Sequence, residues 1–92
     1  MNSETSHKNI ESLLTKLLTN YTLFFSKDGL LNSEGRKLFE LIARLIIAEN
    51  PERKGLIVKV RKNPTLENVI KVAVMYIDEE LVNALVRDGD PL

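Results

Sequence analysis

The sequence predicts a mainly α-helical fold, a small bundle of three long helices at residues 6–27, 33–49 and 64–88. Residues 55–62 are expected to add a short strand or a fourth helix. Two observations lead to this fold class. Apolar residues recur at helical spacing along the long segments, and residues typical of helix starts and helix stops lie between them.

A chain of 92 residues is enough for one domain, so we expect residues 1–92 to form a single unit. Residues 1–5 are expected to be a disordered tail and residues 89–92 a short tail. The N-terminal stretch lacks the apolar region of a signal peptide, and no apolar run is long enough to span a bilayer. The sequence therefore predicts a cytoplasmic protein without membrane contact.

The first segment carries the clearest helical stripe. Polar residues fill the opposite side, as in an amphipathic helix packed on a core. A cation favours the last turn of a helix, and glycine accepts the left-handed conformation that follows it, so Lys27 and Gly29 predict the end. The stripe consists of Ile10, Leu13, Leu14, Leu17, Leu18, Tyr21, Phe24 and Phe25.

The second segment is apolar around most of its circumference. Asn32 or Ser33 can cap its N-terminus. Within residues 38–48 only Glu40 and Arg44 are polar, and they are spaced to form an ion pair one helical turn apart. Such a helix must be covered on several sides.

The third segment allows two interpretations. Its β-branched residues would suit a hairpin between residues 56–62 and 69–77, which would make the fold α+β. Its polar residues favour a helix from Pro64, because they recur every three or four positions apart from a gap at Met75. These polar residues are Glu67, Lys71, Asp78, Glu79, Asn83 and Arg87.

Residues 55–62 are the most ambiguous part of the chain. Leu56, Val58 and Val60 alternate with other residues, and this pattern slightly favours a strand over a short helix. A lone strand needs a partner for its backbone groups, and a second copy of the chain is the simplest one.

The residue types used in most catalytic and metal sites are absent or scattered. There is no cysteine, and the one histidine, His7, lies in a segment expected to fray. Consecutive carboxylates at residues 78–80 would diverge by about 100° per residue on a helix. Asp88 and Asp90 offer fewer oxygens than a hard cation needs. The sequence therefore predicts no catalytic residues, no metal and no cofactor, and a protein that is not an enzyme.

Two helices that need cover on more than one side predict a homodimer. The first function hypothesis is thus a non-enzymatic interaction or regulatory protein that works through protein–protein contacts, with an unidentified protein partner. The candidate residues for the subunit or partner contact are Phe39, Ile42, Ile46, Val58, Val72, Tyr76 and Val82.

An uneven charge distribution supports a second hypothesis. The net charge is zero, but residues 32–62 carry eight basic and four acidic side chains, whereas residues 63–92 carry two and six. The basic residues of segment 53–62 suggest a dimeric nucleic-acid-binding regulator, although such proteins are usually basic overall. The candidate contacts for nucleic acid are Arg53, Lys54, Lys59, Arg61 and Lys62.

Overall fold

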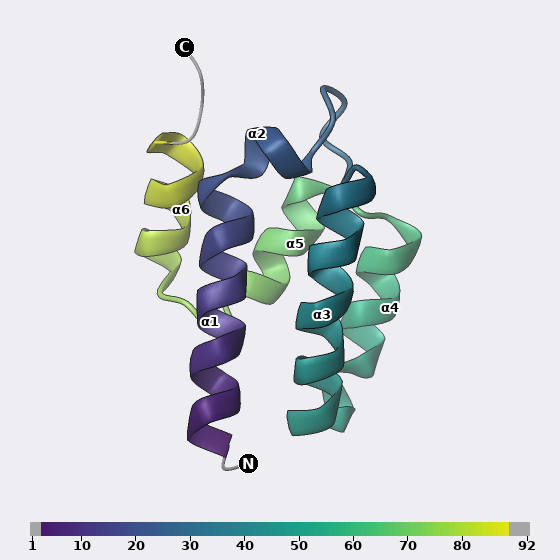
Figure 1. The fold of residues 1–92 in the computed structure, drawn as a ribbon, viewed down its shortest axis with the longest axis vertical. Coiled ribbons are helices and arrows are strands. Elements are labelled where there is room, and N and C mark those ends of the chain that lie inside the picture. The colour runs from purple at the N-terminus through teal and green to yellow at the C-terminus, as the bar shows by residue number, and fades with distance from the viewer. Residues whose placement is uncertain (1–2, 89–92) are drawn as a thin grey trace.

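The computed structural model describes residues 3–88, which are mainly helical and contain no strand (Figure 1). Two isolated β-bridges are the extended pairings in this part of the chain. The elements are α1 (Ser3–Thr19), α2 (Tyr21–Phe24), α3 (Ser33–Glu49), the 3₁₀ turn η1 (Pro51–Arg53), α4 (Lys54–Lys62), α5 (Leu66–Ala73) and α6 (Glu79–Asp88).

The helices pack side by side as a bundle (Figure 1). α1 and α3 run in opposite directions and contact each other, α6 packs on α1, and α4 packs on α3 (Figure 1). The short helix α2 contacts α3 at one end of the bundle, and α5 contacts α4 behind the α1–α3 pair. No helix within residues 3–88 has the length and apolar character needed to cross a membrane.

One apolar cluster fills the space between the helices, and every helix except α2 contributes buried residues to it. The predicted stripe of α1 is confirmed, because Ile10, Leu14, Leu17 and Leu18 are fully buried. The cluster is completed by Phe25, Leu31, Leu38, Phe39, Ile42, Ala43, Ile46, Ile57, Val60, Val69, Val72, Ala73, Tyr76, Ile77 and Val82.

The first helix differs from the prediction at both ends. Residues 3–5, predicted to be disordered, belong to α1, while the predicted tail at 89–92 lies outside the described residues. α1 stops at Thr19 instead of reaching residue 27. The side-chain amide of Asn20 donates to the carbonyl of Lys16 at 3.0 Å. A side chain that bonds to the preceding turn competes with the continued helix, and this explains the break.

Gly29 adopts the predicted left-handed conformation, with φ of 82°, but in a tight loop and not at a helix end. The loop is closed by a bridge between Phe25 and Leu31, and the amide of Ser26 donates to the carbonyl of Leu30 at 2.7 Å. A side chain at this φ would be strained, so glycine suits the turn.

The boundaries of α3 match the predicted residues 33–49, and Asn32 is the cap. Its side-chain oxygen accepts a hydrogen bond from the amide of Gly35 at 2.8 Å. The predicted pair between Glu40 and Arg44 does not form. Glu40 instead accepts two hydrogen bonds from Arg61, at 2.9 and 3.0 Å, because α4 packs beside α3.

Residues 54–62 form the helix α4, so the slight preference for a strand was wrong. The hairpin between residues 56–62 and 69–77 is likewise absent from the described chain. Ile57 and Val60, three positions apart, lie on the buried face of α4. A helix satisfies its backbone groups internally, so this segment needs no strand from a second copy.

The predicted helix 64–88 is two helices separated by a turn at residues 74–78. The hydroxyl of Thr65 caps α5 by accepting from the amide of Asn68 at 3.1 Å, and Asp78 accepts from the amide of Glu80 at 2.8 Å. The break coincides with the gap in the polar pattern at Met75. It reverses the chain, so that α6 returns along α1 (Figure 1).

Candidate functional site

The residues predicted to form a subunit contact lie mostly in the core of a single chain, and this corrects their predicted role. Six of them have exposed fractions between 0 and 6%, and Val58 is half-buried. Neighbouring helices of the same chain cover α3, which removes the reason to place these side chains on a surface. The six are Phe39, Ile42, Ile46, Val72, Tyr76 and Val82.

A different set of large apolar side chains is exposed. Leu23 on α2 is 66% exposed and Leu41 on α3 is 51% exposed. Three more lie at or near the turn between α5 and α6, where Val74, Met75 and Leu81 are 39 to 49% exposed. Helical periodicity did not separate these residues from the core, because it does not show which face another helix will cover.

The five basic residues of segment 53–62 have different environments. Arg61 is held by Glu40, and this hydrogen bond raises the pKa of its guanidinium group. The Arg53 guanidinium lies 5.0 Å from the ring centre of Tyr76. Lys54, Lys59 and Lys62 are exposed and form no ion pair with any described residue. The structure therefore leaves these three lysines available for an anionic partner.

Tyr76 joins several elements at one end of the bundle. Its hydroxyl accepts a hydrogen bond from the side-chain amide of Asn50 at 3.2 Å. The ring of His7 lies 5.5 Å from the Tyr76 ring, between centres, and His7 also contacts Glu11 at 2.9 Å. His7 is thus packed on this cluster, contrary to the fraying predicted for its segment. Sequence separation concealed the cluster, because Asn50 and Tyr76 are far apart in the chain.

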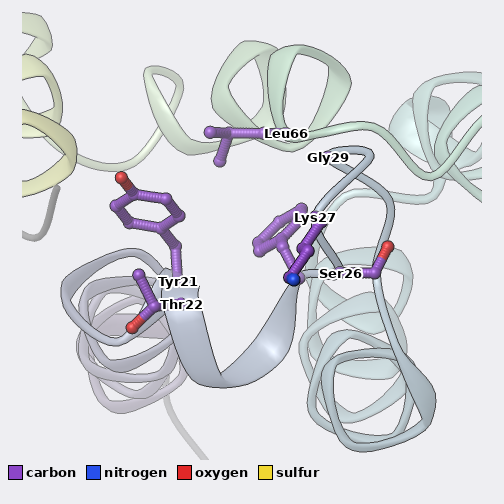
Figure 2. Close-up of a pocket in the computed structure, with 7 residues that line it drawn as sticks. Tyr21, Thr22, Ser26, Lys27, Gly29 and Leu66 are labelled. Atoms are coloured by element: carbon purple, nitrogen blue, oxygen red, sulfur yellow. The ribbon is translucent and has the colours of Figure 1, made fainter. Parts of the chain in front are cut away.

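A surface pocket opens between α2, the loop that follows it and the start of α5 (Figure 2). Its volume is about 340 Å³. Figure 2 shows Tyr21 and Leu66 projecting from opposite sides of this pocket, with Lys27 on the loop side. The residues that line it are Tyr21, Thr22, Phe25, Ser26, Lys27, Gly29 and Leu66.

Backbone hydrogen bonds hold the two sides of this pocket together. The amide of Leu66 donates to the carbonyl of Gly29 at 3.0 Å, and Leu30 forms a bridge with Thr65. The hydroxyl of Ser26 donates to the carboxylate of Asp28, and this hydrogen bond lowers the Asp28 pKa. The loop is therefore fixed against α5, and Lys27 is exposed and forms no ion pair with a described residue.

A smaller pocket, of about 200 Å³, lies between α3 and α4. Its charged residues already have partners within the chain: Arg61 is paired with Glu40, and Arg36 donates to the carbonyl of Leu31 at 3.4 Å. It is therefore a weaker candidate than the α2–α5 pocket. It is lined by Leu31, Arg36, Phe39, Glu40, Val60, Arg61 and Pro64.

Within the described residues, no three His, Cys, Asp or Glu side chains come together in a way that could hold a metal ion. The possible cation pair Asp88 and Asp90 lies partly outside the described residues.

No protein-family model, curated protein or solved structure matches this chain. The function is therefore inferred from the pocket and the exposed surfaces.

Proposed function

We propose that this protein is a non-enzymatic binding module that acts as a homodimer through protein–protein contacts. We further propose that the α2–α5 pocket receives an apolar side chain of a protein partner. The observation that carries this proposal is the pocket itself, which opens at the surface and is lined by Tyr21, Phe25 and Leu66.

The size and rigidity of the pocket suit a side chain from a partner. Its volume of about 340 Å³ is near the lower end of the roughly 300–1,000 Å³ typical of ligand pockets. Aromatic or aliphatic side chains that fill such pockets commonly dominate the affinity of a protein interface. Because the walls are already joined by the Leu66–Gly29 hydrogen bond, little ordering is needed on binding.

The position of Lys27 at the pocket favours a partner that carries an acidic group beside its apolar side chain. It lines the pocket and has no ion-pair partner among the described residues, whereas the neighbouring Asp28 accepts the hydroxyl hydrogen of Ser26. A lysine at the rim of an interface contributes mainly to the association rate and to specificity. We therefore expect Lys27→Ala to slow binding and to reduce its salt dependence, with a smaller loss of affinity than a change inside the pocket.

The decisive experiment compares partner binding by two variants that add the same charge. Leu66→Glu places a carboxylate inside the pocket, at the start of α5, where an acidic residue is compatible with the helix. Leu23→Glu places one on α2, at a side chain that is 66% exposed and does not line the pocket. Partners recovered from the native host by pull-down and mass spectrometry are then titrated with each purified variant.

We expect a partner that binds the wild type and Leu23→Glu with similar affinity and binds Leu66→Glu at least tenfold more weakly. Circular dichroism should show equal helix content for all three proteins. Unchanged binding of every partner by Leu66→Glu would exclude the pocket as the contact site. Recovery of nucleic acid alone would favour the alternative regulator, which the unpaired lysines of α4 support.

A further inference from the structure

Two oppositely charged surfaces of the chain are open to a partner. The first, the basic face of α4, consists of Lys54, Val58, Lys59 and Lys62. Its three lysines are exposed and unpaired within the described residues, and Val58 between them is half-buried. No acidic residue occurs in α4.

The second surface, the acidic corner, lies at the start of α6 and consists of Met75, Asp78, Glu79, Glu80 and Leu81. Its three carboxylates are exposed and form no ion pair with a described basic residue. Met75 is 43% exposed and Leu81 is 49% exposed. A protein interface combines an apolar centre with a polar rim, and Met75 and Leu81 with the three carboxylates supply both.

These two surfaces lie on opposite flanks of the bundle. α4 packs on α3 and α6 packs on α1, so α3 and α1 lie between them (Figure 1). Among the described residues, no ion pair joins the basic face to the acidic corner within one chain. We infer that the basic face of α4 binds the acidic corner of a second copy, and that this contact forms the homodimer on which the proposed function rests.

Charge balance favours a second copy over a nucleic acid. The three lysines of one surface match the three carboxylates of the other, Asp78, Glu79 and Glu80. Each chain contributes one surface of each sign, so a second copy meets the first head to tail, with the basic face of one chain on the acidic corner of the other. The net charge of the whole chain is zero, whereas nucleic-acid-binding domains are usually basic.

Charge reversal on each surface separately tests this contact. One variant, the α4 reversal, changes Lys54, Lys59 and Lys62 to Glu. The other, the α6 reversal, changes Glu79 and Glu80 to Lys and leaves the capping residue Asp78 in place. A matched control changes Lys8 and Lys16, exposed on α1, to Glu. Circular dichroism checks the fold of each variant, and light scattering measures its mass alone and in an equimolar mixture of the two reversals.

We expect the wild type and the α1 control to have about twice the 10.5 kDa chain mass. Each reversal alone should be monomeric because its two surfaces then repel each other. Their mixture should recover the dimer, since the contact between a reversed and an unreversed surface again joins opposite charges. Salt should weaken the wild-type dimer by screening the contact.

A wild-type dimer with a mixture that remains monomeric would overturn the proposed contact and leave the homodimer itself standing. A monomeric wild type would overturn both, whereas binding at the α2–α5 pocket is measured independently. If the α4 reversal stays dimeric and the wild type binds duplex DNA through these lysines, α4 is a nucleic-acid surface and the inference is wrong.

Discussion

Tyr76 is the residue through which distant parts of the chain are held together. Its ring contacts His7 of α1 and Arg53 of η1, and its hydroxyl accepts from Asn50 at the end of α3. The side chain is 6% exposed, so the loss of either its ring or its hydroxyl removes a contact in the interior of the protein. The buried side chain of Tyr76 thus links α1, η1 and the end of α3 through its ring and its hydroxyl group.

Replacing Tyr76 separates the contributions of its ring and hydroxyl. Tyr76→Phe leaves the ring in place and removes the hydrogen bond from Asn50, so we expect a loss of about 0.5–1.5 kcal/mol in the free energy of unfolding. Tyr76→Ala also removes the buried ring and should cost about 3–5 kcal/mol, as for other large aromatic truncations. Urea unfolding measures both values. Equal losses for the two variants would contradict a packing role for the ring.

Asp28 provides a second test at the residue scale. The hydrogen bond from Ser26 lowers the pKa of its carboxyl group below the ordinary aspartate value. A lowered pKa in the folded state means that this interaction stabilises the protein above the unfolded pKa. The contribution is lost as the pH falls through the folded pKa. Because the group is exposed, the effect on overall stability is small.

An NMR titration of the Asp28 carboxyl carbon checks this assignment. We expect a midpoint below that of an unstructured aspartate in the wild type and a return toward it in Ser26→Ala. A variant at a distant exposed site, Ser12→Ala, should leave the midpoint unchanged. Identical midpoints in the wild type and Ser26→Ala would show that this hydrogen bond does not control the pKa.

At the scale of the elements, two helical glycines differ in how closely the neighbouring backbone approaches them. Gly35 and Gly55 both lie in helices, α3 and α4. A Cβ atom at Gly35 would collide with the carbonyl oxygen of Phe24, so α2 packs on α3 only because that side chain is absent. A Cβ atom at Gly55 would meet no atom within 4 Å.

The two glycines therefore predict stability changes of opposite sign. Gly55→Ala should stabilise the protein by about 0.4–1 kcal/mol, because alanine restricts the unfolded chain and favours a helix. Gly35→Ala should destabilise it by about 1–3 kcal/mol, as for other overpacked sites. Thermal unfolding followed by circular dichroism compares the two variants under identical conditions. A destabilising Gly55→Ala would indicate that α4 is not a helix in solution.

At the scale of the whole molecule, basic and acidic side chains lie on separate surfaces although the net charge is zero. Within residues 3–88, three lysines without an ion pair lie on α4 and three carboxylates without an ion pair lie at the start of α6. Interactions between such surfaces weaken strongly with salt, because exposed charges farther apart than the Debye length are largely screened. Salt dependence therefore shows whether charged surfaces take part in an interaction.

The nucleic-acid alternative makes a quantitative prediction at this scale. If Lys54, Lys59 and Lys62 bind phosphates of duplex DNA, each contact contributes about 0.9 to the slope of log affinity against log salt. Their joint replacement by Ala should then flatten the slope by nearly three units, about 2.7. Fluorescence anisotropy with a labelled duplex measures the slope. We expect no such binding, because the net charge of the chain is zero, whereas nucleic-acid-binding domains are usually basic.

The sequence by itself determined the helical class of the fold and the features that depend on near neighbours. Helical spacing predicted the buried stripe of α1, and a capping side chain with its following turn predicted α3 to the residue. The left-handed conformation of Gly29 was also predicted, since it depends on the residue type. These signals act within a few residues, so they can be read without knowing the rest of the fold.

Only the tertiary structure decided the conformation of residues 54–62, the break at 74–78 and the location of the α2–α5 pocket. Residues 56–60 suit a strand or a helix, and packing against α3 and α5 resolves the choice in favour of α4. The pocket joins residues 21–29 to Leu66, which are remote in sequence. The tertiary structure also decides which apolar side chains are exposed. Periodicity shows which residues share a face, but a neighbouring helix determines whether water or protein covers it.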